Sequence, residues 1–291
     1  MDKYMKHFLI KFLMLRVKLA RYIRKYNSYS RRKINLDSPK LASKNHPYTP
    51  FKELYYNHKQ NVSDKWSHYF DIYDEFFKRF IEANANVLEI GIQNGGSLQI
   101  LNKYFKNAHI YGVDINPKVL DLRLEENILV HNFDITDEQT LKKSFKNITF
   151  DIIIDDGSHI CSDIITTFNL LFPRLKPGGV YLIEDLHTSY WSSHGGAYLN
   201  EGSAIEFFKK FIDILNFYHI KDSHFNEKLT LPDFYIIQWL QSINFQDSVI
   251  VINKSTLPRK IPHKRVIVGN LEPVTPVLEE AKMEGWYHIN N

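Results

Sequence analysis

The stretch of sequence that decides the fold runs Val87-Leu88-Glu89-Ile90 and continues directly into Gly91-Ile92-Gln93-Asn94-Gly95-Gly96-Ser97. The short apolar run predicts a buried strand, and the glycines after it permit positive φ angles and a close approach of the backbone to a ligand. A dinucleotide-binding turn would carry glycine where Gln93 stands, and a nucleoside-triphosphate loop would add a Lys-Ser/Thr pair. The turn therefore predicts a ligand site but favours neither of these ligand classes.

Further apolar runs alternate with amphipathic segments on both sides of this turn. The expected strands are 86–90, 108–113, 128–131, 150–154 and 180–183, and the expected helices are 66–80, 97–105, 137–145, 162–171 and 204–215. This alternation predicts an α/β fold with a parallel sheet covered by helices on both faces. Two later runs, 239–244 and 248–253, are separated by three residues, which favours a C-terminal antiparallel hairpin.

Acidic residues stand where four of the expected strands end. Asp114 follows the second strand and Asp134 the third, while the pairs Asp155-Asp156 and Glu184-Asp185 follow the fourth and fifth. Each residue alone has a simpler explanation, since Asp commonly caps helices and forms turns. Ligands bind at the carboxyl ends of parallel strands, so the recurrence of acids at successive ends predicts a shared site.

Two histidines accompany the last two acidic pairs, in Asp155-Asp156-Gly157-Ser158-His159 and in Glu184-Asp185-Leu186-His187. So many like charges are unfavourable together unless a cation neutralises them. Mg²⁺ prefers carboxylate oxygens and is the expected cation. A helix cap or a loop histidine explains any one of these residues, but caps alone do not explain both acidic pairs.

Residues 87–97 resemble motif I of the S-adenosylmethionine-dependent class I methyltransferases, and residues 112–116 resemble the acidic motif that follows it. The turn Leu175-Lys176-Pro177-Gly178-Gly179 is similar to a further motif of that superfamily. The resemblance implies a Rossmann-like class I methyltransferase fold. It implies that Glu89, Gly91, Gly95 and Ser97 surround the methionine part of the cofactor, that Asp114 binds the ribose and that Asp134 lies near the adenine; Asp155 is also expected among the cofactor-binding residues.

A narrower group is indicated by residues 152–160 and 181–191. They resemble metal-dependent methyltransferases that include macrolide sugar O-methyltransferases and proteins named cephalosporin hydroxylases. The resemblance extends over roughly residues 62–255, including Ser63-Asp64-Lys65-Trp66 and Phe245-Gln246-Asp247-Ser248.

This narrower resemblance also implies roles for the residues at the strand ends. Mg²⁺ is held by an acid of the fourth strand end, Asp156 in preference to Asp155, together with Glu184 and Asp185. The expected general base is His159, with His187 as the second choice. Tyr190 and Trp191 are expected in a loop over the acceptor, whereas His68 and Tyr69 are either pocket residues or core.

Composition and charge narrow the remaining possibilities. The chain has 291 residues, of which 44% are hydrophobic and 24% charged, so a fibrous or wholly disordered protein is excluded. The single cysteine, Cys161, cannot form an internal disulfide, which indicates a reducing, cytoplasmic compartment. Outside residues 1–35 the acidic residues outnumber the basic ones, which argues against nucleic acid as a partner.

The first 35 residues carry eleven Lys and Arg against one acid, Asp2. Their spacing predicts a basic amphipathic helix with a linker up to residue 50, and the methyltransferase domain is expected over 51–291. Two fates are open for the helix: peripheral contact with an anionic membrane surface, or packing on the domain or on another chain, as in a homo-oligomer. The apolar runs are too short for a transmembrane span.

The function expected from these features is S-adenosylmethionine- and Mg²⁺-dependent O-methylation of a sugar hydroxyl on a glycan or glycosylated natural product. A hydroxylase-like enzyme is an alternative, although a facial iron site would prefer two histidines and one carboxylate. A noncatalytic scaffold that retains the methyltransferase fold is the other alternative.

Overall fold

A computed structural model describes residues 49–220, 231–260, 266–268, 274 and 287–289. The predicted N-terminal helix and nearly all of its linker lie outside these residues, so the arm and the boundary at residue 50 remain predictions. Within the described part of the chain, no helix combines the length and apolar character needed to cross a bilayer.

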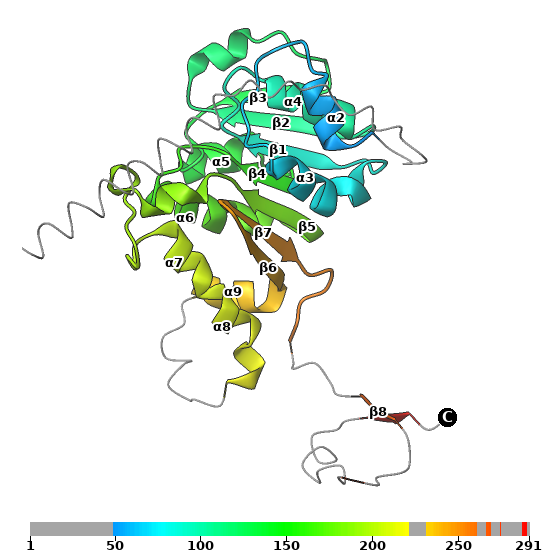
Figure 1. The fold of residues 1–291 in the computed structure, drawn as a ribbon, viewed down its shortest axis with the longest axis vertical. Coiled ribbons are helices and arrows are strands. Elements are labelled where there is room, and N and C mark those ends of the chain that lie inside the picture. The colour runs from blue at the N-terminus through cyan, green and yellow to red at the C-terminus, as the bar shows by residue number, and fades with distance from the viewer. Residues whose placement is uncertain (1–48, 221–230, 261–265, 269–273, 275–286, 290–291) are drawn as a thin grey trace, which may run out of the picture. The chain divides into compact units, whose positions relative to one another are not determined.

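Seven of the described strands form one sheet in the order β3-β2-β1-β4-β5-β7-β6 (Figure 1). Strands β1 to β5 pair in parallel, and β7 pairs antiparallel with both β5 and β6. Their bounds are β1 (Asn86–Ile90), β2 (His109–Asp114), β3 (Ile128–Asn132), β4 (Phe150–Asp155), β5 (Leu175–Ile183), β6 (Leu240–Gln246) and β7 (Val249–Lys254). The predicted parallel sheet with a C-terminal antiparallel hairpin is confirmed.

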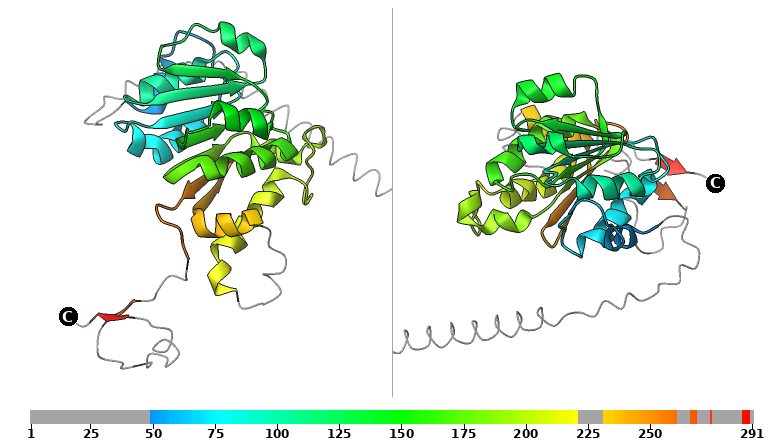
Figure 2. Two further views of the ribbon diagram at one scale, coloured as in Figure 1. Left: turned by 180° about the vertical axis from the view of Figure 1, so that it is seen from behind. Right: turned by 90° about the horizontal axis from the view of Figure 1, so that it is seen from above.

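Helices cover both faces of this sheet, as the views in Figure 2 also show. One face packs against α2 (Phe51–Tyr56), α3 (Tyr69–Phe77) and α4 (Gly96–Tyr104). The other packs against α5 (Glu138–Ser144), α6 (Cys161–Leu171), α7 (Ala204–Lys209), α8 (Phe211–Leu215) and α9 (Leu231–Trp239). Apolar side chains of the helices therefore cover both faces of the sheet, which explains why the strand sequences are almost continuously apolar.

Alternation along the strands divides the core between the two faces. On β1, Val87 packs with the α3 and α4 layer, whereas Leu88 and Ile90 pack with the α5 and α6 layer. Phe168 of α6 makes ring contacts with Tyr181 of β5 and Phe208 of α7. Burying such large rings gives this layer much of its stability.

Four details differ from the elements predicted from the sequence. The aromatic helix begins at Tyr69 rather than at residue 66, and the predicted helix 204–215 is broken at Lys210 into α7 and α8. Helix α9 was not predicted, because its sequence LPDFYIIQW is apolar almost all round and lacks a polar face. The short strands β8 (Val266–Val268) and β9 (Tyr287–Ile289), which pair in parallel, were also not predicted.

Lys254 joins the last strand of the sheet to its neighbours from inside the core. Its side chain is buried, and its Nζ donates hydrogen bonds to the backbone oxygens of Phe172 and Leu175 and to the hydroxyl of Tyr235. Burial lowers the pKa of Lys254 to about 8. The residue ties β7 to the start of β5 and to α9.

The fold brings the ends of β1, β2, β3, β4 and β5 to one edge of the sheet. The registers pair Ile90 with Val113 and with Asp155, and Asp155 in turn with Ile183. The residues just beyond these positions are the glycines and acids that the sequence singled out, so they meet at this edge.

Candidate active site

The glycine turn after β1 adopts a backbone that requires glycine. Gly91 has a φ of +80°, and a Cβ atom added there would lie 2.0 Å from the backbone oxygen of Asp156. The Gly91 amide donates a hydrogen bond to the carbonyl of Val113. The turn after β1 is therefore fastened between the ends of β2 and β4.

Asp114 holds the same turn from β2. Its Oδ2 accepts hydrogen bonds from the amides of Ile92 and Gln93, at 3.0 and 3.1 Å. Asp134 is held locally, since its Oδ1 accepts from the amide and the hydroxyl of Thr136. The carboxyl groups at the ends of β2 and β3 are thus fixed in position before any ligand binds.

A pocket of about 250 Å³ lies over these strand ends. Four of the predicted cofactor-binding residues line it: Gly91, Asp114, Asp134 and Asp155. The predicted metal ligand Asp156 and the predicted base His159 line the same pocket. One pocket therefore brings together residues predicted to bind the cofactor, a residue predicted to bind the metal and the residue predicted to act as the base.

Three other predicted cofactor residues do not line this pocket. Glu89 is fully buried and accepts a 2.6 Å hydrogen bond from the hydroxyl of Ser97. Ser97 lines a small second pocket, which it shares with Gly91, Gln93 and Asp156. Gly95 is the N-cap residue before α4, with a φ of +76°, and faces leucine side chains. Glu89 and Gly95 thus stabilise the glycine turn from within the protein, since Glu89 bonds to Ser97 and the Gly95 amide donates a hydrogen bond to the carbonyl of Ile92.

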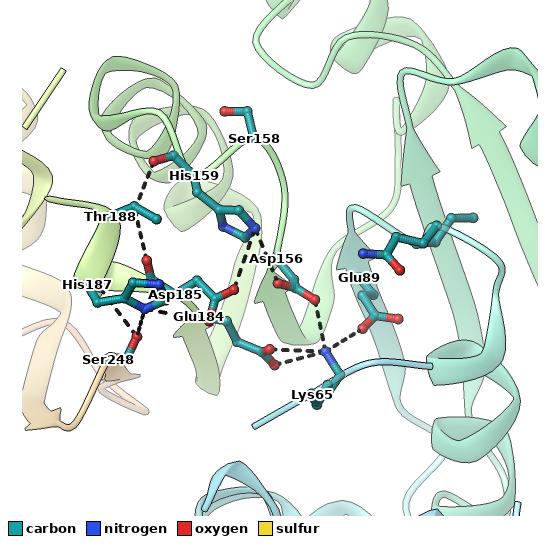
Figure 3. A network of polar contacts seen from close by, with 12 residues as sticks. Lys65, Glu89, Asp156, Ser158, His159, Glu184, Asp185, His187, Thr188 and Ser248 are labelled. Carbon is teal, nitrogen blue, oxygen red and sulfur yellow. Dashed lines mark hydrogen bonds and ion pairs between the residues drawn. The ribbon is translucent and has the colours of Figure 1, made fainter. Parts of the chain in front are cut away.

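No role was predicted for Lys65, whose ammonium group lies among the carboxylates of the site (Figure 3). Its Nζ lies 3.2 Å from Glu89, 3.1 Å from Asp156 and 3.0 Å from Glu184, and its side chain is 1% exposed. Burial alone would lower the pKa of Lys65, but Asp156 and Glu184 outweigh burial and hold it well above its usual value. A lone lysine in a loop normally indicates a solvated surface, so only the resemblance of residues 63–66 signalled it.

The two adjacent aspartates after β4 have different surroundings. Asp155 is buried, accepts a hydrogen bond from the hydroxyl of Tyr181, and has its pKa raised by burial to about 7. Asp156 instead contacts Lys65 and lies 3.8 Å from the Nε2 of His159. This geometry favours Asp156 over Asp155 as the metal ligand.

Asp185 and Glu184 also point in different directions. Asp185 lies 3.8 Å from the Nε2 of His159 and accepts a 2.7 Å hydrogen bond from the hydroxyl of Tyr69. Both oxygens of Glu184 contact Lys65, and the hydroxyl of Tyr73 donates a short hydrogen bond to one of them. Burial raises the pKa of Glu184 to about 8, although Lys65 opposes the shift.

The donor set at this edge suits a hard divalent cation. Asp156, His159 and Asp185 each offer one atom, and these atoms lie within 4.8 Å of one another. Asp156 and Asp185 supply carboxylate oxygens, which are the ligands that Mg²⁺ prefers, and His159 supplies a ring nitrogen. Of the predicted metal ligands, Asp156 and Asp185 face this position, while Glu184 lies behind them on Lys65.

Strained backbone is concentrated at the same edge. Among the described residues, the non-glycine positions with positive φ include Gln93, His159, Asp185 and Ser248. Gln93 lies in the glycine turn. The hydroxyl of Ser248 and the Nδ1 of His187 share a 2.6 Å hydrogen bond. Such conformations cost free energy and persist where the surroundings hold them, which is typical of functional sites.

The predicted acceptor residues lie on the rim. Tyr190 and Trp191 are both 48% exposed, and neither lines the main pocket. The ring of His187 contacts those of Trp191 and Trp66, at centroid distances of 4.8 and 6.0 Å. The Nδ1 of His187 also lies 3.9 Å from Oδ1 of Asp185, so the two predicted bases, His159 and His187, flank the same carboxylate.

His68 and Tyr69 do not line either pocket. The Nε2 of His68 contacts the backbone oxygen of Asp247 at 3.0 Å, which ties α3 to the β6–β7 turn. Tyr69 is 1% exposed and supports Asp185 through its hydroxyl. The sequence left open whether Tyr69 is a pocket residue or a core residue, and its burial makes it a core residue.

The fold is that of a class I methyltransferase. A family model described as FtsJ-like methyltransferase matches residues 71–189. The MycE methyltransferase of mycinamycin biosynthesis, solved in complex with Mg and SAH, superposes with a TM-score of 0.62 at 25% identity, covering 82% of this chain and 59% of that one. The class I fold predicted from the sequence is confirmed.

Two curated relatives are O-methyltransferases by name, and the name of the first includes a rhamnosyl group. The 8-demethyl-8-alpha-L-rhamnosyl tetracenomycin-C 2'-O-methyltransferase of Streptomyces olivaceus is 38% identical over 165 residues, which are 53% of this chain and 43% of the relative. The demethylmacrocin O-methyltransferase of Streptomyces fradiae is 39% identical over 146 residues, 46% of this chain and 36% of the relative. The chain therefore spans less than half the length of these relatives, and the predicted resemblance to macrolide sugar O-methyltransferases is confirmed.

The hydroxylase-like alternative is not supported. The relatives named above are methyltransferases. The candidate metal cluster found among the described residues has one histidine and two aspartates, whereas a facial iron site has two histidines and one carboxylate.

Proposed function

We propose that this chain is an S-adenosylmethionine-dependent and Mg²⁺-dependent O-methyltransferase that acts on a sugar hydroxyl of a glycosylated small molecule. The observation that carries the proposal is the single pocket lined both by Gly91, Asp114 and Asp134 and by Asp156 and His159. A methyl donor held by the first group lies next to the base and the metal ligands of the second.

The site residues divide the chemistry between them. Asp156 and Asp185 would hold the cation, with Glu184 behind them, and a divalent cation there would lower the pKa of the acceptor hydroxyl and orient it. His159 would remove the hydroxyl proton as the acceptor oxygen attacks the methyl carbon. The new O–C bond would form as the C–S bond breaks and the C–S electron pair goes to sulfur, which would leave S-adenosylhomocysteine and protonated His159.

The aromatic rim supports a glycosylated acceptor. Trp66, Tyr190 and Trp191 are each about half exposed, and the rings of Trp66 and Trp191 contact that of His187. Aromatic faces pack well on sugar rings and on apolar aglycones. One relative named above acts, by its name, on a rhamnosyl tetracenomycin, which is a compound of this kind. Membrane contact through residues 1–35, homo-oligomerisation and the compartment remain predictions.

The proposal is tested with the full chain, S-adenosylmethionine, Mg²⁺ and a panel of rhamnosylated and other glycosylated aglycones. Mass spectrometry should find products that gain one methyl group on the sugar, and EDTA should stop the reaction. If the chain binds the cofactor but methylates no hydroxyl in the panel, the proposal fails and the scaffold alternative gains support.

A further inference from the structure

Ser248 occupies a backbone position that favours glycine. It is the second residue of the two-residue turn between β6 and β7, where Gln246 pairs with Val249, and its φ is +64°. Hairpin turns usually place glycine or asparagine at a residue with positive φ, because a Cβ atom is strained there. A serine therefore keeps its side chain here at a cost in backbone strain, which persists because the surroundings hold it.

The hydroxyl of Ser248 contacts His187 in two places. Its Oγ accepts a 3.3 Å hydrogen bond from the backbone amide of His187 and shares a 2.6 Å hydrogen bond with the Nδ1 of the same residue (Figure 3). The backbone oxygen of Ser248 also accepts a 2.9 Å hydrogen bond from the amide of Leu186. The turn after β5 is thus fastened to the β6–β7 turn, and the ring of His187 is held by one of its two nitrogens.

A chain of polar groups continues from Ser248 to Asp185. The side chain of Ser248 hydrogen-bonds to the hydroxyl of Tyr69, which in turn donates a 2.7 Å hydrogen bond to Oδ1 of Asp185. The same carboxylate oxygen lies 3.9 Å from the Nδ1 of His187. A proton on Nδ1 is attracted by the charge of Asp185, whereas a lone pair there would be repelled by it. These contacts favour the neutral tautomer with its proton on Nδ1, so that Nδ1 donates to Ser248 and Ser248 donates to Tyr69.

The other ring nitrogen of His187 is left for a ligand. In the part of the chain that the structure describes, no residue hydrogen-bonds to its Nε2, and the side chain is 30% exposed. With the proton on Nδ1, Nε2 carries a lone pair that can accept a hydrogen bond. The rings of Trp66 and Trp191 contact the same imidazole. A sugar ring packed on these indoles therefore lies beside His187.

We propose that Ser248 is a positioning residue that holds His187 in the tautomer protonated on Nδ1, so that the Nε2 of His187 accepts a hydrogen bond from a hydroxyl of the acceptor sugar. The inference rests on the proposed function and adds how the acceptor is held. His159 and His187 flank the two oxygens of Asp185. His159 thus serves the hydroxyl to be methylated, while His187 binds a second hydroxyl of the same sugar.

Nitrogen-15 NMR of the full chain, labelled on histidine, tests the tautomer without cofactor, metal or acceptor. The ring nitrogens of a neutral histidine differ in chemical shift according to which one carries the proton, so spectra are recorded at about pH 8, above the ordinary pKa of histidine. The chain has 13 histidines, and the signals missing from His187→Gln identify His187. The wild type should carry the proton on Nδ1, and Ser248→Gly should show a larger share with the proton on Nε2.

Ser248→Gly also separates positioning from folding. Glycine relieves the strain of the positive φ, so this variant should unfold within a few degrees of the wild type. With a glycosylated aglycone that the wild type methylates as the probe, KM for the acceptor should rise about three- to tenfold, as for one lost hydrogen bond, and kcat should stay within about twofold. Ser242→Ala is the matched control, because it removes a hydroxyl of β6 that bonds to Asn253 and should change neither the tautomer nor KM.

The outcomes separate this inference from the proposed function. A proton on the Nε2 of His187 in the wild type, or equal tautomer proportions in the wild type and Ser248→Gly, would overturn the positioning role of Ser248. An unchanged KM in Ser248→Gly would overturn the hydrogen bond between His187 and the acceptor. If the wild type methylates no acceptor, the proposed function fails and the role of His187 toward the acceptor fails with it, whereas the tautomer result stands.

Discussion

His159 and Asp185 leave the ends of two neighbouring strands and meet with the Nε2 of the histidine 3.8 Å from Oδ2 of the aspartate. Asp156 lies at the same distance from that nitrogen. Both His159 and Asp185 have positive φ angles, so the backbone after β4 and after β5 is bent to bring them together. The relationship places a candidate base between two candidate metal ligands.

Replacing His159 with alanine tests its role as the base. His159→Ala should lower kcat by about 10²–10⁴-fold, the usual contribution of a general base, and leave the affinity for S-adenosylmethionine within about twofold of the wild type. Steady-state kinetics and calorimetry measure the two quantities. His109→Ala is the control, since His109 is exposed at the start of β2, at the other end of that strand from the pocket. Equal turnover by His159→Ala and wild type would exclude this residue as the base.

Replacing Asp185 with asparagine tests its proposed role as a metal ligand. Asp185→Asn keeps an oxygen that can accept the hydrogen bond from Tyr69 but removes the charge. Mg²⁺ affinity measured by calorimetry should fall at least about tenfold. Glu138→Gln, which removes a surface ion pair on α5, should leave Mg²⁺ affinity unchanged. Undiminished Mg²⁺ binding by Asp185→Asn would rule out Asp185 as a ligand.

Two glycines with the same backbone conformation allow a matched comparison. Gly91 and Gly178 have φ angles of +80° and +78°, but a Cβ at Gly91 meets the backbone of Asp156 at 2.0 Å, whereas at Gly178 it meets only the methyl of Thr256 at 3.3 Å. Each alanine variant should lose about 1 kcal/mol or more of unfolding free energy through strain. Gly91→Ala should lose more and should also bind S-adenosylmethionine weakly. Chemical denaturation and calorimetry give both quantities, and equal losses would contradict the close packing of Asp156 on the turn.

Much of this fold could be predicted because its strands are buried on both faces and end in recognisable turns. The run Val87-Leu88-Glu89-Ile90 was placed correctly as β1, and the acids after β4 and β5 were expected at one edge of the sheet. The role of Lys65 could not be derived in this way, since its partners lie on strands far away in the sequence. The split between Asp155 and Asp156 also needed the structure, because adjacent residues turn to different neighbours.

Lys254 predicts a pH dependence of stability. Its pKa is lowered by burial to about 8 in the folded chain, whereas in the unfolded chain it takes its ordinary value of 10.5. Between pH 8 and pH 10.5 the unfolded chain therefore holds a proton on Lys254 that the folded chain has released. The free energy of unfolding consequently rises as the pH increases over this range, and this gain is lost again as the pH falls back to 8. Relative to Lys254→Met, the wild type should gain up to about 3 kcal/mol between pH 8 and pH 10.5.

Denaturant unfolding of both chains across this pH range measures that difference. Lys106→Met serves as the control, because Lys106 is exposed and should leave the slope unchanged. A constant difference between wild type and Lys254→Met would show that Lys254 keeps its proton in the core.

The most direct test of the central claim is calorimetric titration of the full chain with S-adenosylmethionine, with and without Mg²⁺, because the pocket over Gly91 and Asp114 must hold this cofactor for any later step. The account predicts one cofactor per chain with a micromolar dissociation constant, and weaker binding by Asp114→Asn. No binding to the folded wild-type chain under either condition would contradict it.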